Sequence, residues 1–348
     1  MVPLFVSIAV MLVVLELMIL YYGSRQSGEY AFISPKIGSS ESWLVGPRLA
    51  KAMMKRDREG TRRILEEVNA APREDVLWES ISGVEEKLRH RFVEAYLSLL
   101  QYLPDDLRRF FEEARILWDI QNLKIIVDLV ESRLYGDESF LGPHGYLSDR
   151  ETSSLMMSSD LGALRKRVSE ALPALAVDEA EEADAFRMSL ETAGYEYLDA
   201  VVKEIGTSSA SMAWNQLQRV YDLRNLSLTA RLIHVGLDQE EITPRLFPFG
   251  RLFREKTLQS LAACRGYPQF LQQLGETKFG RELAGRGFEL SRPDDVRRAF
   301  LVWIYEEVGA LGITDIGVRE AIGYMLSLWL EYDTVRDAFA LIEEGAEA

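Results

Sequence analysis

A short motif that recurs three times along the chain is the feature that most constrains its fold. An aromatic residue precedes an aspartate, and a polar residue follows three positions after that aspartate. The copies are Trp118-Asp119-Ile120-Gln121-Asn122, Tyr221-Asp222-Leu223-Arg224-Asn225 and, more weakly, Tyr332-Asp333-Thr334-Val335-Arg336. The aspartates are 103 and 111 residues apart, so the copies are almost evenly spaced. A repeat at this spacing predicts three related units of about 100 residues each.

A shorter pattern upstream of each aspartate supports the repeat. It is a Gly-x-x-Leu or Gly-x-Leu step, found from Gly46 to Leu49, from Gly145 to Leu147 and from Gly250 to Leu252. The steps precede the aspartates of their own units by 73, 77 and 83 residues. We therefore predict a separate N-terminal segment followed by three helical units, with these boundaries: 1–23, 24–138, 139–242 and 243–348.

The spacing of apolar residues indicates the fold class. Beyond residue 42 they fall mostly three or four positions apart, which is typical of amphipathic helices, and strand-like alternation is rare. One apolar stripe runs from Val84 to Leu100 and ends before Pro104. Gly, Pro and Ser cluster where we expect connections, at 136–145, 206–211, 243–250 and 275–293. The pattern predicts an all-α chain of helical hairpins.

We interpret the motif aspartates as helix N-caps. An aspartate carboxylate can accept the unpaired N–H groups of a first helical turn and favours the positive end of the helix dipole. Asn122 and Asn225 would complete a pairing like a capping box. Loss of one such cap is expected to cost about 1 kcal/mol. The alternative interpretation is that these polar residues contact a partner directly.

The N-terminal segment predicts a membrane anchor. Residues 2–22 form an apolar run with a single charge, Glu16. As a helix the run would span roughly 30 Å, which is one bilayer crossing. No basic stretch precedes it and no A-x-A-like site follows it, so we prefer an anchor to a secretory signal peptide. Positive charges lie only on its C-terminal side, which predicts that the rest of the chain is cytoplasmic.

Composition argues against several classes of function. A formal net charge of −15 would repel nucleic acid. Cys264 cannot form an internal disulfide, and His90, His144 and His234 are too scattered for a zinc site. The chain has no phosphate-loop, dinucleotide-binding, zinc-protease or serine-hydrolase motif. We therefore predict no catalytic residue, cofactor, metal or small-molecule substrate.

Two longer segments resemble the C-subunit family of the archaeal and vacuolar (A/V-type) rotary ATPases, whose vacuolar members are known by the letter d. One is LWDIQNLKIIVDLVESRLYG at 117–136 with HGYLS at 144–148, and the other is VYDLRNLSLTARLIHVGLDQEEITPRLFPFGRLF at 220–253. The segments YAFISPKI at 30–37 and RLAKAMMKRDREGTRRILEEV at 48–68 are also similar to the opening of that family. In the third motif Arg336 replaces the asparagine, so the likeness is weaker there.

The resemblance implies a role without chemistry. Members of the family consist of three similar helical units arranged as a funnel. They sit on the proteolipid rotor ring and receive the central shaft, so torque passes between the soluble motor and the membrane. ATP synthesis or ATP-driven transport of protons or sodium ions depends on that coupling. We therefore expect three partners, namely the proteolipid ring, the shaft subunits and, through the N-terminal helix, the lipid membrane.

The apolar segment is a departure, because the family is largely soluble. A helix that turned outside the ring would meet the stationary membrane subunit once per revolution. We therefore place residues 2–22 in the ring lumen, or alternatively give them only a role in delivery to the membrane. The basic cluster at 48–63 is interpreted as a solvated helix face, with contact to anionic lipid or to an acidic shaft subunit as the alternative.

Two other classes of function stay open. A membrane-anchored helical-repeat scaffold unrelated to ATPases would show the same pattern. Co-purification with catalytic subunits and proteolipids would distinguish a rotor subunit from such a scaffold. An enzyme is the third class, and turnover by the purified chain would support it.

Overall fold

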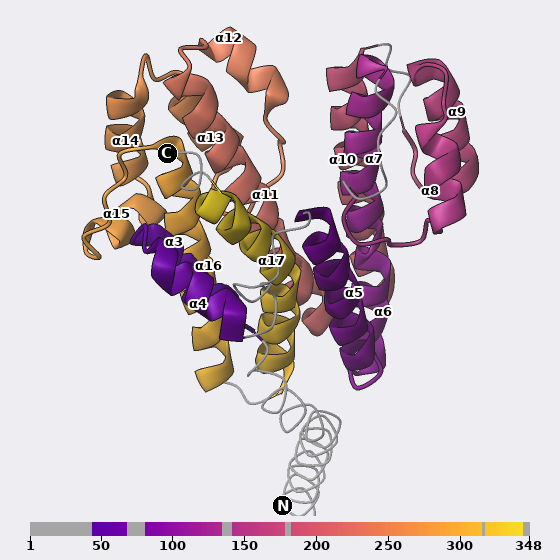
Figure 1. Cartoon of the computed structure of the whole chain (residues 1–348), viewed down its shortest axis with the longest axis horizontal. Helices are drawn as coiled ribbons and strands as arrows, with labels where there is room; N and C mark the ends of the chain where they lie inside the picture. Colours follow the sequence, from indigo (N-terminus) through magenta and orange to yellow (C-terminus); the bar gives the residue numbers. More distant parts are fainter. Residues whose placement is uncertain (1–43, 68–80, 134–140, 178–181, 315–316, 344–348) are drawn as a thin grey trace, which may run out of the picture.

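The computed structural model describes residues 44–67, 81–133, 141–177, 182–314 and 317–343, and Figure 1 shows their arrangement. Within these ranges the regular elements are helices and no strand occurs, which confirms the all-α prediction. The anchor predicted at residues 2–22 lies outside the described residues. Among the helices that are described, none is both long and apolar enough to span a bilayer.

The helices follow one another with short connections. The first group is α3 (Gly46–Met54), α4 (Arg58–Glu67), α5 (Ile81–Leu100), α6 (Asp105–Ala114) and α7 (Ile116–Ser132). The second is α8 (Asp149–Met156), α9 (Leu161–Ala171), α10 (Ala183–Ile205), α11 (Ser208–His234), α12 (Gln239–Ile242) and the 3-10 helix η3 (Thr243–Arg245). The third is α13 (Glu255–Ala262), α14 (Tyr267–Gly275), α15 (Lys278–Ala284), α16 (Pro293–Thr314) and α17 (Val318–Glu343).

Contacts between distant parts of the sequence hold these groups together. The helix α5 packs against α17, while α6 and α10 both pack against α11. The first helix, α3, packs against both α16 and α17, more than 200 residues away in sequence. In Figure 1, α3 and α4 accordingly lie on the side of α16 and α17, away from α7 and α10. The chain therefore returns to its starting point.

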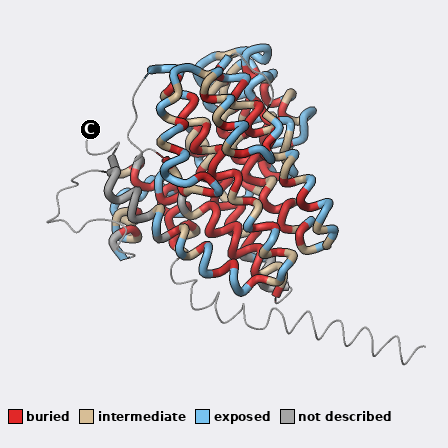
Figure 2. Tube along the Cα trace, turned by 90° about the vertical axis from the view of Figure 1, so that its right-hand side faces the viewer, coloured by how far each residue is buried: buried red, intermediate tan, exposed pale blue. Residues whose placement is uncertain are grey.

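Buried apolar residues run along the long helices, as Figure 2 shows. On α7, the residues Leu123, Ile126, Val127 and Val130 are all buried, as expected for the inner face of an amphipathic helix. One large apolar core extends through all three groups, and a smaller one joins α3 and α4 to α17. The core fixes the long helices relative to one another.

The prediction that the motif aspartates are helix caps is wrong. The helix α7 begins three residues before Asp119, directly after Arg115, which alone separates it from α6. Asp222 lies in the middle of α11, and Asp333 lies well inside α17. The cap of α11 is Thr207, whose hydroxyl accepts a hydrogen bond from the N–H of Ala210 at 3.2 Å. The first two aspartates have another task, because their partners lie far away in sequence.

Candidate functional site

Asp119 holds a loop that follows its own helix. Its buried carboxylate accepts hydrogen bonds from the N–H groups of Gly145 at 2.8 Å, Tyr146 at 2.6 Å and Leu147 at 3.3 Å. One turn along α7, the Asn122 side-chain oxygen accepts the N–H of Gly142 at 2.7 Å. Its amide nitrogen donates to the carbonyl of Pro143 at 3.0 Å. We call such a helix-borne acid and its loop a clamp.

Asp222 and Asn225 form a second clamp with the same geometry. The carboxylate of Asp222 accepts the N–H groups of the segment 251–253, each at 3.0 Å. Asn225 both accepts from the N–H of Phe247 at 2.9 Å and donates to the carbonyl of Phe247 at 2.9 Å. The aspartate and asparagine of the motif are therefore brought together with a loop in both full copies.

The third clamp uses a different acid from the one that the sequence motif suggested. Glu331 on α17 accepts the N–H groups of Val45 at 2.8 Å and Gly46 at 2.7 Å. Thr334, three residues later, takes the position of the asparagine, and its hydroxyl lies 3.0 Å from that of Tyr305. Asp333 lines a cavity instead, and the side chain of Tyr332 lies outside the described part. The third copy is thus shifted by two residues.

The clamped glycines are those of the three Gly-Leu steps, but each is held by the preceding unit. Asp119 holds the loop before α8, and Asp222 holds the loop before α13. Glu331 holds the residues that begin α3, which closes a circle of three clamps. The sequence pattern related each step only to the aspartate further along in the same unit, whereas the contacts run to the unit before.

Glycine is required at these positions because the backbone and the acid approach closely. A Cβ atom added to Gly145 would collide with the carbonyl of Arg115 and with the Asp119 carboxylate. One added to Gly250 would collide with the Asp222 carboxylate. At Gly46 the added atom would collide with Glu331 and the hydroxyl of Tyr305. The repeated glycine is therefore part of the clamp.

The aromatic residues of the motif are core residues beside the clamps. Trp118 packs against Tyr96 and Trp329, with ring centroids 4.7 and 5.3 Å apart. Tyr221 is buried among Tyr195, Phe247 and Phe249. These contacts join α7 to α5 and α17, and α11 to α10 and the second clamped loop, so they support the clamps from within the core.

Burial opposes the charge of the clamp carboxylates. It raises the pKa of Asp119 to about 6, although the three loop N–H groups and the charge of Arg115 act to lower the pKa. Burial also raises the pKa of Asp222, against the N–H groups of residues 251–253 and the charge of Arg219. The clamps therefore hold carboxylates that are costly to ionise without their hydrogen bonds.

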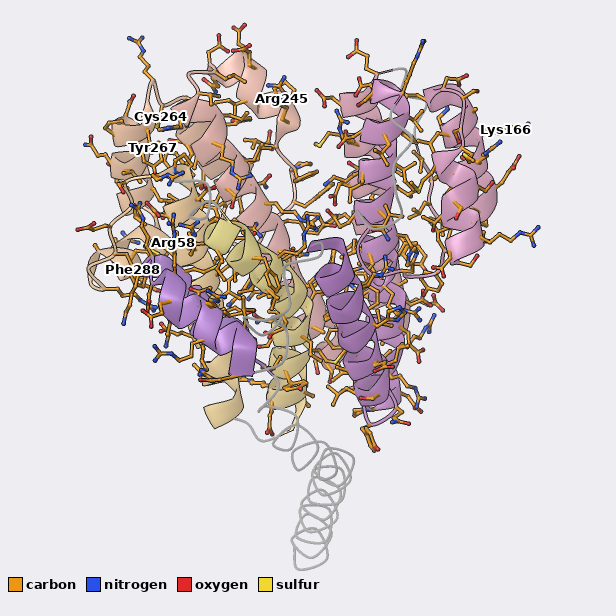
Figure 3. The ribbon with its side chains drawn as sticks, viewed as in Figure 1. Arg58, Lys166, Arg245, Cys264, Tyr267 and Phe288 are labelled. Carbon is orange, nitrogen blue, oxygen red and sulfur yellow. The ribbon has the colours of Figure 1, made fainter. Side chains whose placement is uncertain are left out.

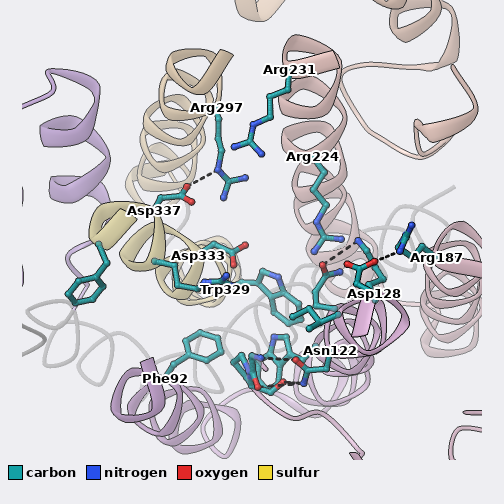
Figure 4. Close-up of a pocket in the computed structure, with 18 residues that line it drawn as sticks. Phe92, Asn122, Asp128, Arg187, Arg224, Arg231, Arg297, Trp329, Asp333 and Asp337 are labelled. Atoms are coloured by element: carbon teal, nitrogen blue, oxygen red, sulfur yellow. Dashed lines mark hydrogen bonds and ion pairs between the residues drawn. The ribbon is translucent and has the colours of Figure 1, made fainter. Parts of the chain in front are cut away.

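The three clamp helices α7, α11 and α17 surround a central cavity of about 590 Å³. Figure 4 shows its walls, which also include residues of α5, α10 and α16. An adjoining cavity of about 1040 Å³ shares several of the same residues and extends toward α12 and η3. Six basic side chains line the central cavity: Lys124, Arg187, Arg224, Arg231, Arg297 and Arg336.

A buried carboxylate in the cavity wall joins three helices. Glu191 of α10 is fully buried and accepts hydrogen bonds from Lys124 of α7 at 2.7 Å and Arg224 of α11 at 3.0 Å. Burial acts to raise the pKa of Glu191, but the charges of Arg224 and Lys124 outweigh it and lower the pKa. The sequence-based predictions missed this group, and the one available signal was a charge within each otherwise apolar segment after the motif.

The described residues contain no cluster of three or more His, Cys, Asp or Glu side chains that could hold a metal ion. The chemistry that the cavity walls offer is recognition by charge, by hydrogen bonding and by apolar contact. The clamps in turn fix the helices that carry those charges.

Comparison with known proteins identifies the family. The ATP synthase (C/AC39) subunit family matches residues 51–347, which include all three clamp acids. The chain is also 24% identical over 291 residues to the C subunit of the A-type ATP synthase of Pyrococcus horikoshii, an alignment that covers 81% of this chain and 78% of the relative. Both findings confirm the resemblance seen in residues 117–136 and 220–253. The chain belongs to the ATP synthase (C/AC39) subunit family.

Proposed function

We propose that this chain is a non-catalytic connector in the rotor of an ATPase of the archaeal or vacuolar type. It links the central shaft to the membrane proteolipid ring, and torque passes through it during ATP synthesis or ATP-driven ion transport. The observation that carries the proposal is the circle of three clamps around one cavity, in a chain that belongs to an ATP synthase subunit family. A part that transmits torque must keep its helices in fixed relative positions, and the clamps serve that purpose.

Purification of the tagged chain from its native membrane tests the proposal. We expect the catalytic subunits, the shaft subunits and the proteolipids to co-purify with it, and the isolated chain to show no ATP hydrolysis. Recovery with unrelated partners would instead indicate a helical scaffold. ATP turnover by the isolated chain would contradict the non-catalytic role.

The position of the predicted anchor is a separate part of the proposal. Residues 2–22 would lie in the lumen of the ring and hold the bulk of the chain on the cytoplasmic face, because a rotating helix elsewhere would strike the stationary membrane subunit. Photo-crosslinkers placed in this segment are expected to capture lumen-facing proteolipid positions. Capture of the stator subunit would refute the lumenal position but leave the connector role intact.

A further inference from the structure

We infer that the central cavity binds the end of an amphipathic helix from a partner protein, with carboxylates on one side of that helix. The inference rests on the proposed function, since the partner it describes is a shaft subunit. It adds the chemistry of the contact, which follows from three features of the cavity: its charge, its apolar side and its size.

The charge of the cavity is opposite to that of the whole chain. The formal net charge of the chain is −15, yet six basic and three acidic side chains line the cavity. Two of the three acids are already paired, Asp128 with Arg187 and Asp337 with Arg297. The cavity walls therefore attract a negatively charged group, while the rest of the acidic surface repels one.

The group around Glu191 is where a partner carboxylate gains most. Lys124 and Arg224 share this one carboxylate, so two cations stand against one anion in a buried wall. Burial lowers the pKa of Lys124, and the charge of Arg224 lowers it further, while Glu191 opposes both. Both cations stay accessible, with about a fifth of each side chain exposed, at 23% and 19%. A second carboxylate from outside would relieve their mutual repulsion.

The opposite side of the cavity is apolar. Phe92, Trp118 and Trp329 line it, and their rings pack on one another with centroids 5.3 Å apart in both pairs that include Trp118. In Figure 4, Phe92 and Trp329 lie away from Arg231 and Arg297, which approach from the other side. An occupant that satisfies both sides needs carboxylates on one face and apolar side chains on the other.

The size of the cavity fits a helix end. One turn of an α-helix, with a diameter of about 10 Å and a pitch of about 5.4 Å, fills roughly 400 Å³. The central cavity of about 590 Å³ thus accepts one to two turns, and the adjoining cavity gives access to it. A flat protein surface would not reach the group around Glu191.

The test measures binding of the purified shaft subunits from the same ATPase to the full chain in detergent. The variants Arg231→Glu and Arg336→Glu reverse charges in the cavity, and Lys166→Glu makes the same change on α9, where Figure 3 shows the side chain on the outside of the molecule. We expect each cavity variant to weaken binding roughly tenfold, the control to bind like the wild type, and salt to weaken the wild-type complex. Thermal unfolding of each variant verifies that the fold is retained.

A charge swap gives the decisive arm. Replacing shaft carboxylates with lysine, one at a time, should restore binding to Arg336→Glu for at least one position. If the shaft binds the wild type and both cavity variants equally, the inference is refuted although the connector role stands. If the shaft subunits neither bind nor co-purify with the wild type, the connector role fails and the inference falls with it.

Discussion

At the scale of single residues, the clamps show how one side chain can replace a whole ladder of backbone pairing. Loop N–H groups that are buried need acceptors, and here one carboxylate supplies them for up to three consecutive residues. Hydrogen bonds to an ionised acceptor are stronger than neutral ones, which offsets the cost of burying the charge. The stability of each loop is therefore concentrated in a single residue.

Replacing Asp222 with alanine tests this concentration. The change leaves three N–H groups without an acceptor, so we expect the free energy of unfolding to fall by about 3 kcal/mol or more, well beyond the loss of a cap. Urea-induced unfolding of the full chain measures it. The matched control is Asp333→Ala on α17, which removes the same atoms outside the clamps and should cost roughly 0.5 kcal/mol or less. Equal losses in the two variants would show that Asp222 has no special role.

The glycine that faces the second clamp offers an independent prediction. In Gly250→Ala the new methyl group would collide with the Asp222 carboxylate, so we expect a loss of about 1–3 kcal/mol, visible as a lower midpoint of thermal unfolding. Gly275 ends α14 and has open space around it, and Gly275→Ala should be neutral or stabilise the chain slightly. A harmless Gly250→Ala would mean that the loop can move away from α11.

The clamps also mark the limit of what the sequence could predict at this scale. The repeat identified Asp119, Asn122, Asp222 and Asn225 correctly as special positions. Their partners were beyond reach, because helix-capping rules concern neighbours within one turn, whereas the N–H groups bound by the two aspartates lie 26 to 31 positions away. Glu331 was missed because its longer side chain does the work of an aspartate, so a search for Asp settled two residues too late.

At the scale of elements, periodicity was sufficient to predict helices but not their assembly. The stripe of apolar residues on α7 gave its buried face, since burial follows spacing along a helix. Which helices meet was decided by side chains that show no periodicity. Glu191 illustrates this, since it joins α10 to both α7 and α11 through charges that a sequence pattern presents as ordinary polar residues.

The lowered pKa of Glu191 predicts a pH dependence. In the unfolded chain this carboxyl takes up its proton near pH 4.5, whereas in the folded chain it stays ionised to lower pH. Its contribution to stability is therefore present above about pH 4.5 and is lost as the pH falls through the folded pKa. Urea titrations from about pH 7 to pH 3 should show a smaller acid-induced loss in Glu191→Gln than in the wild type. The same loss in both proteins would contradict the assignment.

At the scale of the whole molecule, the third clamp determines the connectivity. Open arrays of repeats have end units with one neighbour each, and these units unfold most easily. Here Glu331 joins the last unit to the first, so the described helices form a circle in which each unit has two neighbours. The predicted boundaries at residues 139 and 243 fall shortly before the clamped loops, and they stay predictions.

Opening the circle should have a local signature. In Glu331→Ala, we expect the amides of α3 to exchange hydrogen faster, while those of α8 and α13 keep their wild-type rates, because their own clamps are intact. Hydrogen exchange followed by mass spectrometry measures all three helices at once. Asp222→Ala serves as the mirror control, with faster exchange expected at α13 and not at α3. Uniform acceleration everywhere would argue that the clamps do not act separately.

The pair of hydrogen bonds between Glu331 and the start of α3 has a mechanical consequence. A pipe that is slit along its length twists under a load that an intact pipe of the same wall resists easily. Without that pair, the seam between α17 and α3 would be such a slit, and part of each turning stroke would be stored as twist. Two short bonds at one seam thus set how stiffly the whole wall carries rotation.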